Sequence, residues 1–213
     1  MPVSSSQTRD QLIRATRDAI RDVGLPAVTA RVIAERSGAN LASIPYHFGS
    51  KDALVAEALV AEARELVAPV LALLAADRPP PERASEAASL LSELFDASRS
   101  QVPVYLAALA AAPHAPGVRA GLAELWTDLR SRLAHDIRRQ LDARQLPGWV
   151  SPDAMASLIL SVVNGVVVAS VVDPEGPDHR EVAAQFLALL LAAGGLPERH
   201  QPATDVRDHG DPG

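Results

Sequence analysis

The sequence predicts an all-α protein. Apolar residues make up 48% of the chain but aromatic residues only 3%, so the core must be built largely from alanine, leucine and valine. Alanine and leucine are strong helix formers, and the aromatic and β-branched clusters that favour strands are scarce. Apolar residues also recur at helical spacing, beginning with Leu12, Thr16, Ala19, Ile20 and Val23. At 213 residues, the chain is long enough for one or two domains with a sizeable core.

The first two expected helices are bounded by residues that start or stop a helix. The first begins near Gln7 and ends at Gly24 and Pro26. Thr29 is a good N-cap for a short second helix, because its hydroxyl can accept a hydrogen bond from a backbone N–H in the first turn. This second helix is expected to end at Gly38.

The third and fourth expected helices follow directly. Asn40 is expected to cap a short third helix that ends by Gly49, and Ser50 to cap a long fourth helix. Pro45 would then lie in the second turn of the third helix and remove a hydrogen bond from it. Pro69 either kinks or ends the fourth helix. Further helices are expected near 82–98, 103–112, 116–145, 152–172 and 178–194, separated by proline-rich loops.

The chain is expected to divide into a small domain at 1–52, a larger one at 53–194 and a disordered tail at 195–213. Residues 1–52 contain seven Lys/Arg and five Asp/Glu, a net charge of +2. The rest contains thirteen and twenty-one, a net charge of −8, and the whole chain carries −6. The overall charge argues against a nucleic-acid partner, but the mildly basic first domain keeps that possibility open.

Composition also limits the compartment and the chemistry. The chain contains no cysteine, which excludes disulfides, thiolate zinc sites and a cysteine nucleophile and fits a reducing cytosol. The N-terminus lacks the apolar core of a signal peptide. The most apolar run, 157–172, is shorter than a membrane span and contains an asparagine. We therefore expect a buried or interface helix in a soluble, cytoplasmic protein with no membrane partner.

Two short capped helices joined by a tight glycine turn, after a longer helix, form a helix-turn-helix pattern. The segment TARVIAERSGANLASIPYHFGSKDAL, at 29–54, contains Thr-x-Arg-x-x-Ala, Gly, Tyr-x-Phe and Ser-Lys in the order and spacing of the TetR family of bacterial regulators. The first quarter of the chain resembles that family. The resemblance implies a three-helix DNA-binding domain joined by a long helix to a helical ligand-binding and dimerisation domain. The segment NGVVVASVVDP, at 164–174, is similar to the family's dimer-forming helix.

Three positions depart from the family pattern. Val32 stands where an acid is common, and Ala39 stands where valine is usual. Pro45 stands where the family often has a residue that touches DNA. The resemblance therefore does not give the operator sequence.

The resemblance implies a set of DNA-binding residues. These are Thr29, Arg31, Asn40, Leu41, Ala42, Ser43, Tyr46, His47 and Lys51. The first two would contact phosphate, the start of the third helix would face base edges, and the last three would hold phosphate oxygens. Each has a simpler alternative as a helix cap or a surface side chain. Lysine at a helix start is unfavourable to the helix dipole, and a nearby phosphate would explain it.

The larger domain is expected to bind a small-molecule effector. Its candidate lining residues are Phe95, Tyr105, Leu109, Leu122, Trp126, Leu129 and Asn164, each with the alternative of an ordinary core position. A buried Asn164 needs a hydrogen-bonding partner. It can bond the ligand or bond across a dimer seam, and we favour the seam. The few aromatic residues argue against a pocket for large flat cations.

The sequence contains no enzyme motif. The six histidines are scattered, and there is no Walker loop, GxGxxG or nucleophile elbow. We expect no catalytic site, no metal and no cofactor. His200, Asp205, Asp208, His209 and Asp211 are better explained as a solvated tail than as a metal site.

The residues and the resemblance together predict a homodimer that pairs through the helices near 152–172 and 178–194. It would bind a palindromic double-stranded DNA operator and be released by a small molecule, which is the behaviour of a repressor. The alternative is a helical interaction or enzyme module that retains the helix-turn-helix pattern without sequence-specific DNA binding.

Overall fold

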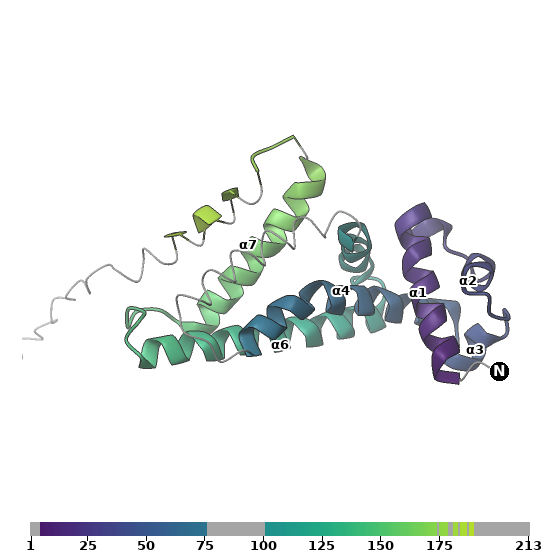
Figure 1. Ribbon diagram of the computed structural model, residues 1–213, viewed down its shortest axis with the longest axis horizontal. Helices are drawn as coiled ribbons and strands as arrows, with labels where there is room; N and C mark the ends of the chain where they lie inside the picture. Colours follow the sequence, from purple (N-terminus) through teal and green to yellow (C-terminus); the bar gives the residue numbers. More distant parts are fainter. Residues whose placement is uncertain are drawn as a thin grey trace, which may run out of the picture.

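The computed structural model describes residues 5–75 and 101–173, together with 175–178, 181, 182, 184–186, 188 and 189. Within these ranges every regular element is a helix, which confirms the all-α prediction. A small three-helix unit lies at one end of the molecule, and long helices extend away from it (Figure 1). The helix expected near 82–98, Phe95 and the tail 195–213 lie outside the described residues.

The small unit contains α1 (Ser5–Val23), the 3-10 turn η1 (Leu25–Ala27), α2 (Ala30–Ser37) and α3 (Ser43–Phe48). Its apolar residues form one core, made by Leu12, Ala19, Ile20, Val28, Ile33 and Ile44. Four positions of the predicted apolar face of α1 are buried. Val23, the last residue of the helix, lies beyond this core and is 48% exposed.

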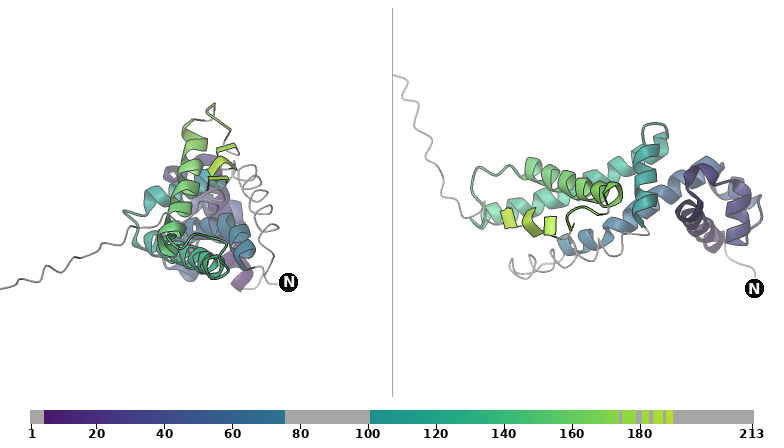
Figure 2. Two further views of the ribbon diagram at one scale, coloured as in Figure 1. Left: turned by 90° about the vertical axis from the view of Figure 1, so that its left-hand side faces the viewer. Right: turned by 90° about the horizontal axis from the view of Figure 1, so that it is seen from above.

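The larger part contains α4 (Lys51–Ala75), a helical segment (Gln101–Ala111), α6 (Pro116–Asp142) and α7 (Pro152–Val172). α4 leaves the small unit and packs along α6, and α6 in turn packs against α7 (Figure 2). α4 continues through Pro69, so this proline does not end the helix. α4 therefore carries the chain from the small unit into the larger part.

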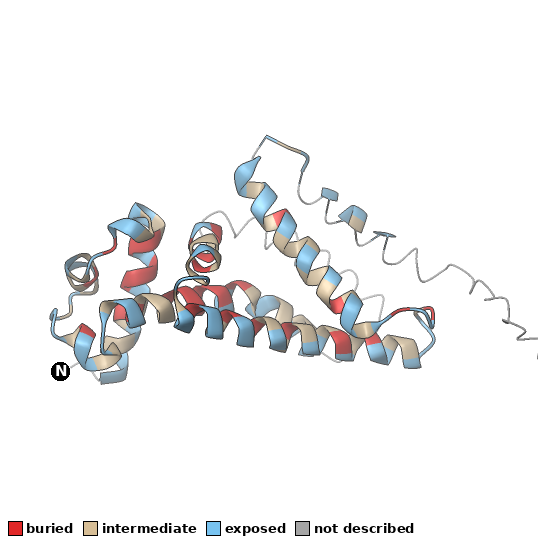
Figure 3. Ribbon diagram, turned by 180° about the vertical axis from the view of Figure 1, so that it is seen from behind, coloured by how far each residue is buried: buried red, intermediate tan, exposed pale blue. Residues whose placement is uncertain are grey.

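The core runs without a break from the small unit along α4 into the larger part. Buried positions on the facing sides of α4, α6 and 101–111 continue it (Figure 3); they include Leu59, Ala63, Leu66, Val104, Ala108, Val118, Leu122 and Leu125. A second cluster lies toward the C-terminal end of α6 and is made by Ala134, Ile137, Val150 and Ala156. Burial of apolar area along α4 is thus the main force that holds the small unit onto the rest of the protein.

α7 is apolar on nearly all sides but is largely uncovered. It has 21 residues, and its most apolar window has a mean hydropathy of 2.3 with 11% of that window buried. Among the described helices it is the one whose length and composition would allow it to cross a membrane. From the sequence, the apolar run 157–172 was expected to be too short to span a membrane. That expectation is wrong, because the run belongs to a longer helix that starts at Pro152. One such helix is a weak indication of a membrane protein, since interface helices have the same composition.

The two sides of α7 have different neighbours. Leu160 and Val167 pack against the main core. The exposed side is a stripe with helical spacing, made by Ala154, Leu158, Ser161, Gly165, Val168 and Val172. We call these six residues the outer stripe of α7.

Candidate functional site

Polar caps and one glycine build the turn between α2 and α3. Thr29 Oγ1 accepts a hydrogen bond from Val32 N at 3.2 Å, which confirms the predicted N-cap of α2. The helix ends at Gly38, whose φ of 68° lies in the left-handed region that favours glycine. Asn40 Oδ1 then accepts a hydrogen bond from Ala42 N at 2.9 Å. These contacts fix the angle at which α3 leaves α2.

α3 begins later than the sequence predicted, and Pro45 costs it no hydrogen bond. Pro45 is the third residue of α3, in the first turn, where backbone N–H groups have no partner within the helix. The carbonyl that an N–H at this position would meet, that of Leu41, accepts from Ile44 N at 3.3 Å instead. Asn40 therefore caps the turn before α3 and not the helix itself. The expected loss of a hydrogen bond at Pro45 is wrong.

The predicted DNA-binding residues are accessible in the structure. Tyr46 is 78% exposed and Leu41 50%. Thr29, Arg31, Asn40 and Ala42 are also exposed, and Ser43, His47 and Lys51 are partly so. Ile44 in the same helix is 2% exposed and anchors α3 in the core of the small unit. α3 thus has an inner face that packs and an outer face that is free to meet a partner.

Three of these residues lie close together in sequence at the junction of α3 and α4. The rings of Tyr46 and His47 meet edge to face, with centroids 4.8 Å apart. Ser50 Oγ accepts a hydrogen bond from Ala53 N at 3.0 Å, which confirms the predicted cap of α4. Lys51 Nζ lies 3.2 Å from Asp52 Oδ1. This pair is exposed and therefore weak, so a phosphate can compete for the ammonium.

Arg9, which sequence reasoning missed, contacts the last residue of α3. Its guanidinium carbon lies 5.1 Å from the centroid of the Phe48 ring, a cation–π distance. The same guanidinium forms an ion pair with Glu57 of α4. Arg9 therefore joins α1, the end of α3 and α4.

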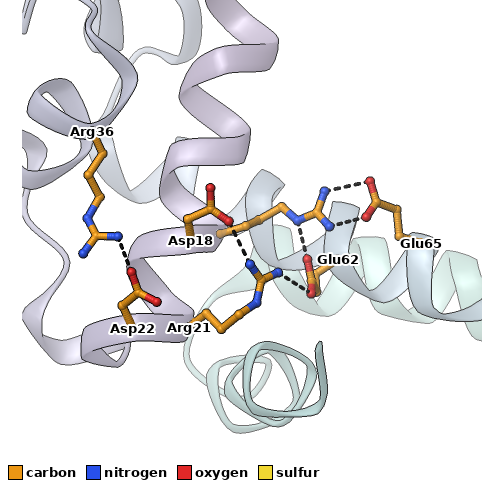
Figure 4. Close-up of polar contacts among 7 residues, drawn as sticks. Asp18, Arg21, Asp22, Arg36, Glu62 and Glu65 are labelled. Atoms are coloured by element: carbon orange, nitrogen blue, oxygen red, sulfur yellow. Dashed lines mark hydrogen bonds and ion pairs between the residues drawn. The ribbon is translucent and has the colours of Figure 1, made fainter. Parts of the chain in front are cut away.

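A second group missed by sequence reasoning is an ion-pair cluster between α1 and α4, made by Arg17, Arg21, Glu62 and Glu65 (Figure 4). Glu62 is completely buried, and its two oxygens accept from Arg17 Nε and, at 3.1 Å, from Arg21. Arg17 also holds both oxygens of Glu65, one of them at 2.8 Å. We call these four residues the α1–α4 ion cluster.

The electrostatics of this cluster follow from its geometry. The hydrogen bonds from Arg17 lower the pKa of the Glu65 carboxyl, with its charge and that of Arg21 adding to the effect. The hydrogen bonds to Glu65 raise the pKa of Arg17, more than its burial lowers it.

The sequence contained a signal for this cluster, because Glu62 falls on the apolar stripe of α4 between Leu59 and Leu66. An acid on such a stripe requires a partner when it is buried.

Two of the predicted effector-site residues are joined by a hydrogen bond, and a third lies beside them. The Tyr105 hydroxyl donates to Asn164 Oδ1. Asn164 Nδ2 donates to the Leu160 carbonyl at 2.8 Å. Burial raises the pKa of the Tyr105 hydroxyl, and the neighbouring Trp126 indole partly offsets that rise.

Asn164 has hydrogen-bonding partners within its own chain. Its amide accepts from Tyr105 and donates to the Leu160 carbonyl, so it is satisfied without a ligand or a second copy, and its favoured role at a dimer seam stays a prediction. Of the other candidates, Leu122 and Leu129 are buried and Leu109 is partly buried against the same core. Among the described candidates, the structure brings Tyr105 and Asn164 into direct contact, and the role of the set as an effector site stays a prediction.

Two family models match this chain. Residues 12–58 match the model described as "Bacterial regulatory proteins, tetR family". Residues 80–194, more than half of the chain, match "BetI-type transcriptional repressor, C-terminal". The chain belongs to the TetR family.

TetR-family relatives share most of its length. A regulator of Chromohalobacter salexigens, "HTH-type transcriptional regulator BetI 2", is 29% identical over 189 residues, which are 84% of either chain. A TetR transcription regulator from Haloarcula marismortui superposes with a TM-score of 0.74 at 20% identity, over 88% of this chain and 98% of that one. A transcriptional regulator from Rhodococcus sp. Rha1 gives 0.71 at 23% identity, over 89% and 99%. The two solved structures show the shared fold.

TetR-family membership makes the chain a DNA-binding transcriptional regulator, and the prediction that it is not an enzyme is confirmed. The N-terminal match extends from α1 into α4 and contains every predicted DNA-binding residue. The C-terminal match contains α6, α7 and the hydrogen bonds that join Tyr105, Asn164 and Leu160.

Proposed function

We propose that this TetR-family protein is a cytoplasmic, homodimeric repressor that binds a palindromic operator through α3 and leaves it when a small molecule binds the larger domain. The observation that carries the proposal is the two-sided α3, anchored inward by Ile44 and exposed outward at Leu41 and Tyr46. Two such helices in a dimer, about 34–36 Å apart, match successive major grooves of DNA.

The proposed roles at the DNA follow from the chemistry of each side chain. Ser43 can donate to or accept from a base edge, whereas Leu41 and Ala42 can make only apolar contacts, for example to a thymine methyl. Thr29, Arg31, Tyr46, His47 and Lys51 have N–H or O–H groups that can donate to phosphate oxygens and fix the register. Asn40 acts by holding the turn, since its side chain accepts from Ala42 N.

The outer stripe of α7 supports the homodimer. An apolar helix face this exposed is costly in water, and burying it against a second copy removes the cost. Ser161 and Gly165 are small, and a Cβ added at Gly165 would meet nothing within 4 Å. Small residues at this place would let two α7 helices approach closely.

The effector site is proposed around the hydrogen bond between Tyr105 and Asn164, beside the Trp126 indole. The polar groups of these side chains are surrounded by apolar side chains, as in most small-molecule sites. A ligand that replaces the Tyr105–Asn164 bond would favour a different placement of α7, and would shift the dimer away from the DNA-binding state. Because the chain has two tryptophans, a Trp149→Phe variant leaves Trp126 as the reporter of ligand binding by fluorescence.

The proposal is tested by selecting random duplex DNA with the purified protein and sequencing the bound fraction. We expect a palindromic consensus whose two halves lie about one helical turn apart. The selection is repeated with protein that has been denatured and refolded, which removes any ligand carried through purification. A refolded protein that selects no consensus would contradict sequence-specific DNA binding.

A further inference from the structure

The α1–α4 ion cluster is the strongest directional contact between the small unit and α4. Arg17 and Arg21 are four residues apart and share one face of α1, and Glu62 and Glu65 share one face of α4. Arg17 reaches both carboxylates at once, and Glu62 is bonded by both arginines. Apolar helix faces can slide or rotate against one another at small cost, whereas a planar guanidinium held by two carboxylates tolerates little change in angle.

The opposite face of α4 meets α6 at the same level. Gly121 lies so close to Val60 that an added Cβ would stand 2.6 Å from Val60 Cγ2, and the Cβ position of Gly117 lies 3.8 Å from Ala56 Cβ. With about 3.6 residues per turn, Ala56 and Val60 lie on the side of α4 opposite to Glu62 and Glu65. This stretch of α4 is therefore held by α1 on one side and by α6 on the other.

We propose that the α1–α4 ion cluster is a positioning joint that fixes the orientation of the helix-turn-helix on α4. With the joint intact, a shift of α4 against α6 reorients α3 as one body with α4. With the joint broken, the angle between α1 and α4 would vary, and only part of the shift of α4 would reach α3. The consequence for DNA affinity rests on the proposed function, but the joint itself does not.

The joint is tested by the spread of orientations of the small unit. The chain has no cysteine, so Glu35→Cys in α2 and Ser131→Cys in α6, both exposed positions, accept two spin labels without background. Doubly labelled protein is diluted into excess unlabelled protein, so that distances within one chain dominate in a monomer or in a dimer. The distance distribution is measured by pulsed electron paramagnetic resonance in this background, in Glu62→Gln, in Glu65→Ala and in the control Asp128→Asn.

Asp128 is a suitable control because its ion pair with Arg132 lies within α6 and joins no two elements. We expect the distribution to broaden in Glu62→Gln and Glu65→Ala and to keep its width in Asp128→Asn. Circular dichroism verifies that each variant is folded. If Glu62→Gln does not fold, the distance distribution of Glu65→Ala tests the proposal by itself, because the Glu65 side chain is 57% exposed and its loss leaves no buried gap. Distributions as narrow as that of the parent protein in the folded variants would overturn the proposal.

Affinity for the selected operator is measured on the same variants without the labels. If the fraction of molecules in the binding orientation falls to about a tenth, the apparent Kd rises about tenfold. An affinity unchanged despite broader distributions would overturn the role of the joint in DNA binding. A parent protein that selects no operator, with the broadening still present, would refute the proposed function and leave the joint standing.

Discussion

The charged and polar side chains discussed above differ chiefly in their exposure to solvent. Glu62 and Arg17 are almost fully desolvated, so each depends on the other for its charge to be tolerated. Tyr46 and Lys51 keep much of their exposure and contribute little to packing, which leaves them available to a partner. Stability and recognition therefore rest on different residues, and mutations can separate them.

Replacing Glu62 by alanine should destabilise the fold by about 3 kcal/mol. Arg17 would keep its pair with the exposed Glu65 but lose its pair with the buried Glu62, and its guanidinium would remain desolvated. Urea denaturation of the purified protein measures this loss. The matched control is Glu124→Ala, whose pair with Arg64 is exposed on both sides and should change stability by less than about 1 kcal/mol. Equal effects of the two substitutions would show that burial of Glu62 does not matter.

The stabilising contribution of Glu65 should depend on acid pH. Its pKa is lower in the folded protein than the ordinary 4.5, so its contribution is complete above that value and disappears as the pH falls through the lowered pKa. The difference in unfolding free energy between the parent protein and Glu65→Gln should thus shrink below pH 4.5. Denaturant titrations at several acid pH values test this. A constant difference would show that the ion pair with Arg17 does not form in solution.

Lys51 and Ser43 should have separable effects on DNA binding. Lys51→Ala should weaken binding to every duplex similarly and flatten the slope of log affinity against log salt by about one unit, because one phosphate contact is lost. Ser43→Ala should instead change the preferred base at one operator position. Fluorescence anisotropy at several salt concentrations measures both. An unchanged salt slope in Lys51→Ala would remove this residue from the phosphate contacts.

At the scale of elements, α4 is the helix on which the arrangement depends. Its buried side continues the core of the small unit into the larger part, while charged and small residues on opposite faces fix it against α1 and α6. α3, by contrast, has only six residues and depends on its neighbours for its shape. A helix so short is unstable alone, so its orientation is set by Ile44, Phe48 and the caps around it.

Gly121→Ala should destabilise the packing of α4 against α6. The new methyl group would clash with Val60, and overpacking of this kind costs about 1–3 kcal/mol, more than the helix propensity that alanine gains. Gly117→Ala in the same helix is the control, since its Cβ makes only ordinary contact with Ala56. Thermal unfolding of both variants should show a lower midpoint for Gly121→Ala alone. A midpoint at or above that of the parent protein would show that Val60 can move aside.

On the scale of the whole molecule, function is expected to need two copies. The helix-turn-helix lies at one end of the protein, and α7, with its uncovered outer stripe, lies in the larger part (Figure 1). A dimer formed through α7 would fix the separation of the two α3 helices, although the interface itself would lie far from them. The hydrogen bond from Tyr105 reaches Asn164 beside the outer stripe, because Asn164 is three residues from Ser161 and four from Val168. Ligand and partner would therefore act on adjacent faces of α7.

Val168→Glu should convert the dimer into a monomer, because it places a charge within the outer stripe of α7, the proposed interface. Sedimentation velocity should show the loss of mass, and affinity for a palindromic operator should fall with it. Ser131→Glu, at an exposed position of α6, adds the same charge outside the stripe and should leave the dimer intact. A Val168→Glu protein that remains dimeric would place the interface elsewhere.

The sequence by itself determined the fold class, the caps at Thr29 and Ser50, the helix at 152–172 and the family, because these depend on local spacing and on contiguous motifs. Only the tertiary structure decided the start of α3 and the lack of a lost bond at Pro45, because Ile44 is buried in the core of the small unit and its N–H bonds the Leu41 carbonyl. It also decided the partner of Asn164, which is Tyr105, and the α1–α4 ion cluster; the residues joined in each case lie more than forty residues apart. Contacts between distant segments depend on how the helices pack, and one sequence does not state that packing.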